Sequence, residues 1–340
     1  MIGRLALPPA VFVVSLAACL APPAAEAQGA AYAGKTVTII VGFKPGGGYD
    51  ATARLLARYL PKYLPGHPTL IVQNMPGANS IIAANHLYSA AKPDGLTLGT
   101  FNHNLVVAQL TGVKGVKFDM TKFAWVGSAA SETTILAVRA DLPYRSVDDL
   151  KKADPPLVVG TTGPGANTYD FPLLLKDLAG AKIKIVTGYS SSADIMLAVE
   201  RKEVDGRAGS YSSMLPFIER KLVRPIVRAR TAEPGTEGLP VDESYAPSPH
   251  ARAIMTLRAA PEAIGRPYVM PPGTPQPYVA AMRQAFSRAI ADPEVAARAA
   301  KGKVPLHFVA GDEALKIVDE VLKQPKDVVD EFGKYVKFGE

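Results

Sequence analysis

The chain has 340 residues, of which 48% are hydrophobic and 20% are charged, a balance typical of a folded protein with more than one domain. Lysine and arginine number 38 against 31 acidic residues, and this net charge of +7 is spread along the chain. A dispersed positive charge favours acidic small ligands or a generally basic surface over a dedicated nucleic-acid face. The single cysteine, Cys19, excludes a disulfide framework and a cysteine-based metal cluster.

Residues 1–27 have the features of an export signal. A short basic start is followed by an apolar stretch from Leu5 to Leu20, and residues 25–27 read AEA, the spacing of a cleavage site. Residues 16–19 read LAAC, which also matches a bacterial lipobox ending at Cys19. Both alternatives stay open at this point. Either one predicts a periplasmic protein, free or lipid-anchored through Cys19.

Strands and helices alternate in the first part of the mature chain. Runs rich in β-branched and apolar residues predict strands at 35–41, 70–73 and 96–101, and helical patterns follow the first two. Such alternation is typical of parallel βαβ units whose sheet is covered on both faces.

The same alternation returns in the second part of the chain. Residues 231–249 are rich in proline, glycine and glutamate and predict a long surface connection, and residues 277–335 predict a mostly helical tail. Strands are predicted at 157–160, 182–186, 205–210, 225–230 and 304–309.

Four loops at the ends of predicted strands form the candidate ligand site. They combine glycine or small hydroxyl residues with a following helix, at 44–50, 74–80, 161–168 and 190–194. Ligands of open parallel sheets bind at this edge, where helix N-termini present free N–H groups to anions. Ordinary strand-to-helix turns use the same residues, but four such loops together favour an anion held between two α/β lobes.

Motifs for catalysis are missing from the sequence. It contains no P-loop, no G-x-G-x-x-G after a strand and no G-x-S-x-G, and its five histidines lack the spacing of metal ligands. His103 differs from the other histidines because it follows the strand at 96–101 on the expected ligand edge. A ligand contact and a plain loop position are the two interpretations. No catalytic residue, metal or cofactor is predicted.

Three motifs in order carry a resemblance to a known family. The first strand is followed by P-G-G-x-x-D ending at Asp50, then V-x-N-x-P-G-A ends at Ala78, and P-D-G-x-T-L ends at Leu98. Over residues 33–338 the chain resembles the substrate receptors of tripartite tricarboxylate transporters, also called Bug-type extracytoplasmic solute receptors.

The chain departs from the family pattern in two places. Asn79 and Ser80 stand where glycines are common, and Tyr169 and Asp170 stand where a histidine-containing helix start is usual. These departures leave the ligand class open.

The resemblance implies an α/β, two-lobed periplasmic-binding-protein-like fold of type II, with a ligand cleft between the lobes. Residues 30–127 plus 250–340 would form lobe 1 and residues 128–249 lobe 2. Hinge crossings are expected near 126–138 and 224–257. The second range includes two of them, and the third crossing lies near 254–257. Such a receptor captures an organic carboxylate (a di- or tricarboxylate or an aromatic acid) by lobe closure and delivers it to an integral-membrane permease. A ligand-sensing partner of a membrane sensor kinase is the alternative. The resemblance also implies a monomer without a nucleic-acid partner.

The resemblance further implies that backbone amides and small hydroxyls hold the ligand carboxylates. Asp50, a plausible N-cap of the next helix, is expected to order its loop rather than touch a carboxylate. Lys44 offers a charge-assisted contact, with a solvated lysine as the alternative. The candidate ligand-binding residues are Lys44, Gly46, Gly47, Gly48, Tyr49, Asp50, Ala78, Asn79, Ser80, His103, Thr161, Gly165, Asn167, Thr168, Ser190 and Ser191.

Overall fold

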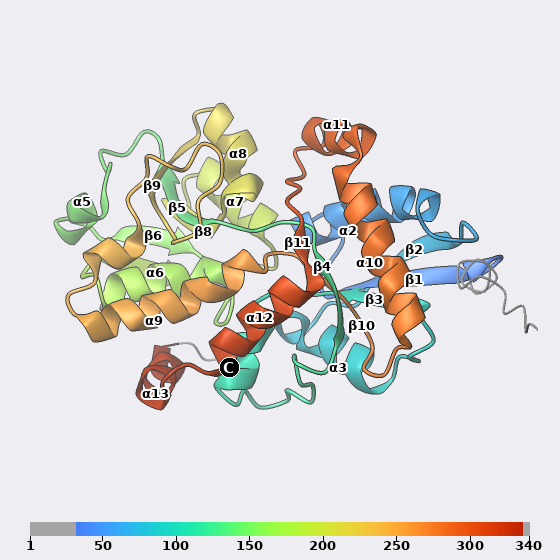
Figure 1. The fold of residues 1–340 in the computed structure, drawn as a ribbon. Helices are drawn as coiled ribbons and strands as arrows, with labels where there is room; N and C mark the ends of the chain where they lie inside the picture. Colours follow the sequence, from blue (N-terminus) through green and yellow to red (C-terminus); the bar gives the residue numbers. More distant parts are fainter. Residues whose placement is uncertain (1–31, 336–340) are drawn as a thin grey trace, which may run out of the picture.

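The computed structural model describes residues 32–335 as two α/β halves that lie side by side, each built on its own sheet (Figure 1). This architecture confirms the fold class predicted from the sequence. The export signal and the lipobox lie outside the described residues and stay predictions.

The first sheet has the strand order β11-β4-β10-β3-β1-β2. Next to its edge strand β2 lies β1, which pairs in parallel with β2 and β3. Antiparallel strands complete the other side, because β10 runs between β3 and β4, and β11 pairs with β4. The bounds are β1 (Thr36–Val41), β2 (Thr69–Asn74), β3 (Thr97–Thr100), β4 (Ala124–Ser128), β10 (Pro267–Met270) and β11 (Val309–Ala310).

The second sheet repeats this plan with the order β7-β6-β8-β5-β9. Here β6 pairs in parallel with β7 and β8, while β5 is antiparallel to β8 and β9. The bounds are β5 (Thr134–Arg139), β6 (Leu157–Gly160), β7 (Ile183–Val186), β8 (Gly206–Ser210) and β9 (Val223–Arg228).

Both sheets are therefore mixed, whereas the sequence pattern predicted parallel units alone. The prediction holds for β1, β2 and β3 and for β6, β7 and β8, which pair in parallel. It fails at β5, which is antiparallel to both of its neighbours, and at β10 and β11, which join the first sheet from far along the chain. The strand predicted at 304–309 is reduced to Val309–Ala310.

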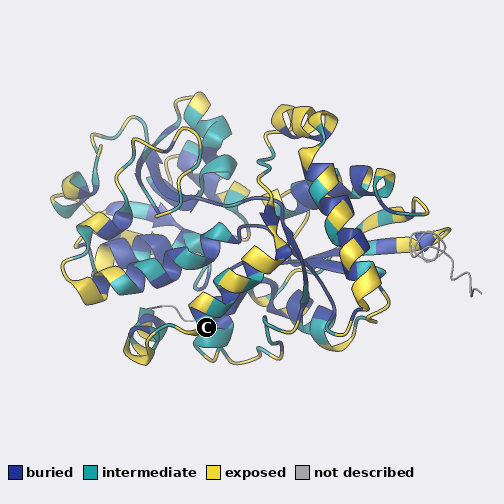
Figure 2. Ribbon diagram, in the orientation of Figure 1, coloured by how far each residue is buried: buried dark blue, intermediate teal, exposed yellow. Residues whose placement is uncertain are grey.

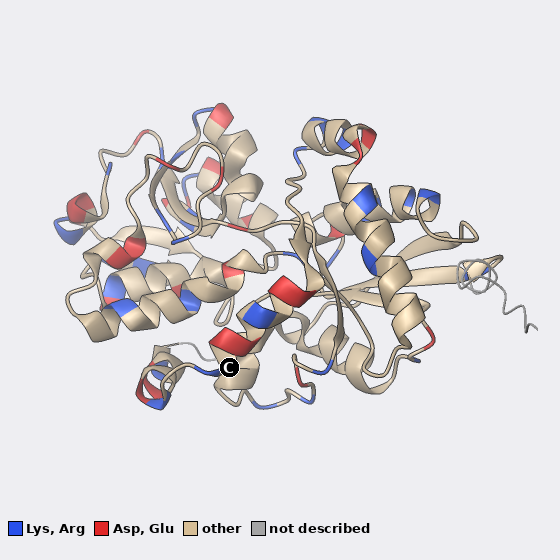
Figure 3. Cartoon of the chain, in the orientation of Figure 1, with Lys and Arg blue, Asp and Glu red and all other residues tan. Residues whose placement is uncertain are grey.

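The helices cover the sheets as amphipathic patterns predict. In α2, for example, Ala53 and Leu56 lie on one face and are fully buried. Acidic and basic residues are interspersed along the helices in Figure 3, so the charge surplus is not confined to one part of the fold. The helices beside the first sheet are α2 (Gly48–Tyr59), α3 (Ile81–Ser89), α4 (Leu105–Leu110), α10 (Gln276–Ala291), α11 (Pro293–Lys301) and α12 (Gly311–Leu322). The remaining helices are α5 (Val147–Lys151), α6 (Asn167–Asp177), α7 (Ser192–Glu200), α8 (Tyr211–Glu219), α9 (Pro249–Ala259) and α13 (Lys326–Tyr335).

Helices α9 and α13 pack on α6, a helix of the second half. We therefore propose that both helices belong to the second lobe, although they lie within 250–340, the range expected for the first. One cluster of buried apolar side chains spans both halves and includes Trp125 on β4 and Phe171 on α6. Figure 2 shows buried residues in both halves.

The first expected crossing, at 129–133, and the third, found at 260–266, connect the two sheets. Between β9 and α9 the chain stays in the second half, where the amide of Ala229 donates to the carbonyl of Thr134 at 2.7 Å and α9 packs on α6. The first and third are hydrogen-bonded to each other, since the amide of Ala129 donates to the carbonyl of Arg266 at 3.1 Å and the amide of Glu132 to that of Glu262 at 3.0 Å. The third crossing was expected near 254–257, but those residues lie inside α9.

Residues 231–249 are more than a surface connection. They include a short 3-10 helix, Asp242–Tyr245, and Asp242 is buried beside the guanidinium of Arg258 at 3.5 Å. Polar residues of this segment thus take part in buried ion pairs. The composition of the sequence does not show which polar residues are buried.

Candidate ligand-binding site

Loops of the two halves meet directly where the sheets adjoin. The side-chain amide of Asn79, after β2, donates to the carbonyl oxygen of Pro164, after β6, at 2.8 Å. The side-chain amide of Asn104, after β3, donates to Oδ1 of Asn167 at 2.9 Å. Asn167 in turn donates to Oγ1 of Thr134 at 2.8 Å. Two of the predicted loops thus contact each other across the interface between the halves.

Asp50 orders the glycine loop after β1. Its carboxylate accepts hydrogen bonds from the amide of Gly46, from Nε of Arg54 and from Nδ2 of Asn74, each at 2.9 Å. Burial opposes ionisation, but the hydrogen bonds from Arg54, Gly46 and Asn74 hold the pKa of this carboxyl below its usual range. Asp50 does not cap α2 as proposed, because Gly47 is the N-cap and Asp50 lies in the first turn. Because its oxygens accept hydrogen bonds from the protein, Asp50 orders the loop.

The remaining residues of this loop are open to solvent. Lys44, Gly46, Gly47 and Gly48 are exposed, and Gly46 has a positive φ of 91°. This backbone is therefore available to a ligand, whereas nothing in the structure holds Lys44 in a defined position.

Tyr49 and His103 converge on the carbonyl oxygen of Gly265, in the third crossing. The Tyr49 hydroxyl donates to it at 3.0 Å, and Nδ1 of His103 lies 2.9 Å from the same oxygen. A carbonyl oxygen can only accept, so Nδ1 carries a proton and donates it. Among residues 32–335, Nε2 of the same ring has no hydrogen-bond partner, although it is buried.

The loop before α3 has an unusual backbone. Ala78, Asn79 and Ser80 are consecutive non-glycine residues with positive φ, at 45°, 48° and 79°. Such strain is maintained only where surrounding contacts impose it. Here Ser80 Oγ donates to the carbonyl of Gly42 at 3.0 Å and accepts from the amide of Asn102 at 3.3 Å. Ser80 thereby anchors the loop, and this leaves Asn79 to reach the other half.

The loop after β6 is shaped by its own polar side chains. The amide of Gly165, which has a φ of 80°, donates to Oδ1 of Asp170 at 3.0 Å, and Thr168 Oγ1 accepts from the amide of Thr162 at 3.1 Å. Burial raises the pKa of Asp170 to about 8. Thr161 is fully buried, and its hydroxyl has no partner among residues 32–335.

The two predicted serines differ in their surroundings. Ser190 is exposed, whereas Ser191 caps α7, since its hydroxyl accepts from the amide of Asp194 at 3.2 Å. Neither makes a hydrogen bond to the first half in this arrangement.

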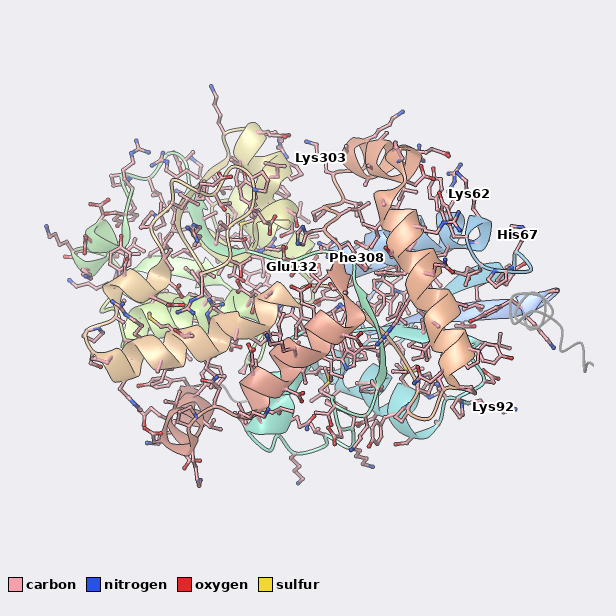
Figure 4. All side chains as sticks on the ribbon, viewed as in Figure 1. Lys62, His67, Lys92, Glu132, Lys303 and Phe308 are labelled. Carbon is pink, nitrogen blue, oxygen red and sulfur yellow. The ribbon has the colours of Figure 1, made fainter. Side chains whose placement is uncertain are left out.

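Arg266 was missed by the sequence analysis. Its guanidinium is buried, with Nε donating to Glu132 at 2.9 Å and one terminal nitrogen to Oγ1 of Thr52 at 2.6 Å. The other terminal nitrogen lies where a side chain at Gly48 would begin, 2.6 Å from an ideal Cβ, which explains why glycine is needed there. Glu132 lies at the junction of the halves in Figure 4. No local pattern in the sequence indicates the contact between Arg266 and Thr52, because these residues are more than two hundred positions apart.

A further bridge lies on the surface. Lys303 Nζ, after α11, pairs with the carboxylate of Glu219 at the end of α8. Figure 4 shows Lys303 extending from the first half toward the second. Exposed pairs of this kind contribute little to stability.

Comparison with known proteins agrees with this geometry. Residues 52–334 match the family described as the tripartite tricarboxylate transporter family receptor. The chain belongs to that receptor family. Its members are extracytoplasmic solute-binding receptors, not enzymes, as the sequence motifs predicted.

Solved structures share the fold of this receptor. It has a TM-score of 0.69 with R. palustris Rpa4515 with adipate, at 20% identity, covering 88% of this chain and 97% of that one. MatC from Rhodopseudomonas palustris with bound malate gives 0.67 at 23% identity, with 87% and 99% covered. The periplasmic binding protein BugD gives 0.66 at 20% identity, with 88% and 96% covered.

A curated relative spans nearly the whole receptor. A UPF0065 protein of Cupriavidus necator is 24% identical over 325 residues, covering 92% of each chain. Within residues 32–335, no helix of the receptor is long and apolar enough to cross a membrane. No cluster of histidine, cysteine or acidic residues within the same range is arranged to hold a metal ion.

Proposed function

We propose that this receptor binds a small organic carboxylate between its two halves and delivers it to a membrane permease of the tripartite tricarboxylate type. The observation that carries the proposal is a set of buried polar atoms where the loops meet that have no partner among residues 32–335. These are Nε2 of His103, Oδ1 of Asn104 and Oγ1 of Thr161. The Thr161 hydroxyl can donate to a carboxylate oxygen, whereas the amide oxygen of Asn104 only accepts, from a ligand hydroxyl or a water. Buried polar groups are nearly always hydrogen-bonded in folded proteins, so an unpaired set at one interface fits a site completed by a ligand.

Structural relatives support the class of ligand. One was solved with malate and another with adipate, both small dicarboxylates. The exposed glycine backbone after β1 supplies N–H groups of the kind that bind carboxylate oxygens. Of the predicted ligand residues, we propose that Gly46, Gly47, Asn79, His103 and Thr161 contact the ligand, with Asp50 and Ser80 as supports.

Closure follows from the contacts between the halves. The Asn79–Pro164 and Asn104–Asn167 hydrogen bonds exist only when the loops meet, so they favour the closed arrangement together with the ligand. A permease that recognises the closed form would then receive only loaded receptor.

A ligand screen tests the proposal. Residues 28–340 are unfolded and refolded to remove any bound compound, and thermal unfolding is followed with succinate, L-malate, adipate, citrate and aromatic acids. A ligand at 100 times its dissociation constant stabilises the folded state by about 2.7 kcal/mol, which raises Tm by a few degrees. If no acid raises the Tm of a well-folded receptor, the proposal is wrong. Transport of the identified acid by a reconstituted permease, with and without the receptor, tests delivery.

A further inference from the structure

The second half buries an arginine that has no acidic partner within residues 32–335. Arg207, on β8, is 3% exposed. The two other buried arginines of residues 32–335 each form ion pairs, Arg258 with Glu262 at 2.7 Å and Arg266 with Glu132 at 2.9 Å. Arg207 forms none, and burial alone lowers its pKa to about 10. A buried charge is costly without a counter-ion, so its presence calls for an explanation.

The guanidinium lies at the ligand edge of the second sheet. One terminal nitrogen would be 2.7 Å from a Cβ built on Gly209, so the side chain runs along β8 toward its C-terminal end. At that end Ser210 pairs with Thr134, the first residue after the crossing from the other half. Thr134 also accepts the hydrogen bond from Asn167, which links this edge to the contacts between the halves.

Two helices begin beside the same guanidinium. One terminal nitrogen of Arg207 donates to the carbonyl oxygen of Ser192, in the first turn of α7, at 3.2 Å. The other donates to Oγ of Ser213, in the first turn of α8, at 2.6 Å. Helix N-termini carry a partial positive charge, so an unpaired cation between two of them is electrostatically unfavourable. An anion placed there would be stabilised by all three positive groups.

The donors needed for such an anion are present. The guanidinium has five N–H groups, of which three are used, since Nε donates to the carbonyl of Ala208 at 3.2 Å and the terminal nitrogens bind the two serines. One N–H on each terminal nitrogen remains. Ser192 and Ser213 are only partly buried, so small anions can approach from this side.

We propose that Arg207 anchors one carboxylate of the ligand in the second half, and that the receptor is therefore specific for dicarboxylates over acids with a single charge. This inference rests on the proposed function for the identity of the anion. The second carboxylate lies toward the exposed glycine backbone of the first half. A half-amide of the same diacid, neutral at the Arg207 end, binds much more weakly.

Substitution of Arg207 tests the proposal against a matched control. Arg207→Met removes the charge and keeps the length of the side chain. Arg224→Met is the control, because Arg224 lies at the opposite end of the same sheet and donates to the backbone carbonyls of Leu142 and Tyr144 at 2.9 and 3.2 Å. Thermal unfolding and calorimetric titration use inorganic sulfate, succinate, adipate and the half-amide of adipate as probes.

The expected results distinguish an arginine that binds the ligand's carboxylate from one that only stabilises the fold. Without anions, R207M unfolds at or above the wild-type Tm, because an apolar side chain replaces an uncompensated buried charge. Loss of a charge-assisted contact weakens binding of the diacids about 10- to 100-fold in R207M, while R224M binds them as the wild type does. The wild type and R224M bind adipate at least about tenfold more tightly than its half-amide.

The other outcomes distinguish the two proposals. If diacids bind R207M as tightly as the wild type, the anchor is overturned and the receptor function stands. A second outcome is that no diacid binds the wild type, but sulfate stabilises the wild type and R224M and not R207M. Arg207 then binds an anion other than a dicarboxylate. If sulfate acts equally on all three proteins and no diacid binds, the anchor is overturned, and the screen with citrate and aromatic acids decides the proposed function. Should R207M not fold, Ser213→Ala keeps the charge and removes the acceptor that orients it, and unchanged diacid affinity in S213A overturns the anchor.

Discussion

The hydroxyl of Tyr49 lies 3.1 Å from Nδ1 of His103, and both groups reach the carbonyl oxygen of Gly265. The loop after β1, the loop after β3 and the third crossing between the halves thus share one hydrogen-bonded centre. A change in the conformation of this crossing therefore directly affects two loops whose residues we propose as ligand contacts.

Replacing Tyr49 with phenylalanine tests this centre. The ring still packs on Phe43, at 4.6 Å between centroids, but the donor to Gly265 is lost. We expect the free energy of unfolding to fall by about 1 kcal/mol and ligand affinity to fall a few-fold. Chemical denaturation and calorimetry measure the two quantities. Tyr88→Phe, whose ring packs on Phe123, is the control and is expected to change stability by less than about 0.5 kcal/mol. Equal effects of the two substitutions would contradict a role for the shared centre.

Gly265 tolerates no side chain. Its φ is 55°, and a Cβ would lie 1.8 Å from the carbonyl oxygen of Ala130 in the neighbouring crossing. We expect Gly265→Ala to lower the free energy of unfolding by at least about 3 kcal/mol, since left-handed strain adds to a backbone clash. Gly112→Ala has a similar φ of 66° with open space around it, so its cost is about 1–2 kcal/mol. Urea unfolding of both variants measures the difference, and similar costs would show that the crossings adjust freely.

The contact between Asn104 and Asn167 reports closure. Removing it with Asn104→Ala is expected to increase the radius of gyration of the unliganded receptor in solution scattering and to weaken ligand binding about 2- to 12-fold. Asn85→Ala is the control, because Asn85 donates to the carbonyl of Gly115 within the first half. If N104A scatters and binds as N85A does, the contact has no part in closure.

Buried carboxyl groups predict how stability depends on pH. Burial raises the pKa of Asp170 to about 8, and burial is also the main cause that raises those of Asp242 and Glu233 to about 7. These groups titrate near 4 in an unfolded chain, so between about pH 4 and pH 8 the folded state binds more protons. Their contribution to stability is complete below about pH 4 and is lost as the pH rises toward 8.

Asp170→Asn isolates one of these groups. The asparagine keeps an oxygen for the amide of Gly165 and removes the titration. We expect the fall in Tm between about pH 5 and pH 8 to be smaller in D170N than in the wild type. Asp148→Asn, at an exposed position of α5, should follow the wild-type curve. A D170N curve parallel to the wild type would show that Asp170 is ionised throughout this range.

Local sequence was sufficient for the elements that alternate along the chain. The strand at 157–160 was predicted with its observed bounds, and α2 followed from apolar residues spaced three and four positions apart. The three motifs ending at Asp50, Ala78 and Leu98 were sufficient for the family, because they describe loops whose backbone shape requires particular residues. These features depend on interactions between near neighbours, which a pattern of residues records.

The tertiary structure alone decided which residues meet at the interface between the halves. His103 and Gly265 are 162 positions apart, and no local pattern in the sequence links them. The same holds for Arg207, whose side chain meets the first turns of two helices, and for β10, which joins the first sheet after the chain has built the second. Burial of apolar side chains brings such segments together, and the pairing of their polar groups follows from that packing. The sequence by itself therefore determined the class of receptor, and only the folded chain showed where an unpaired positive charge lies.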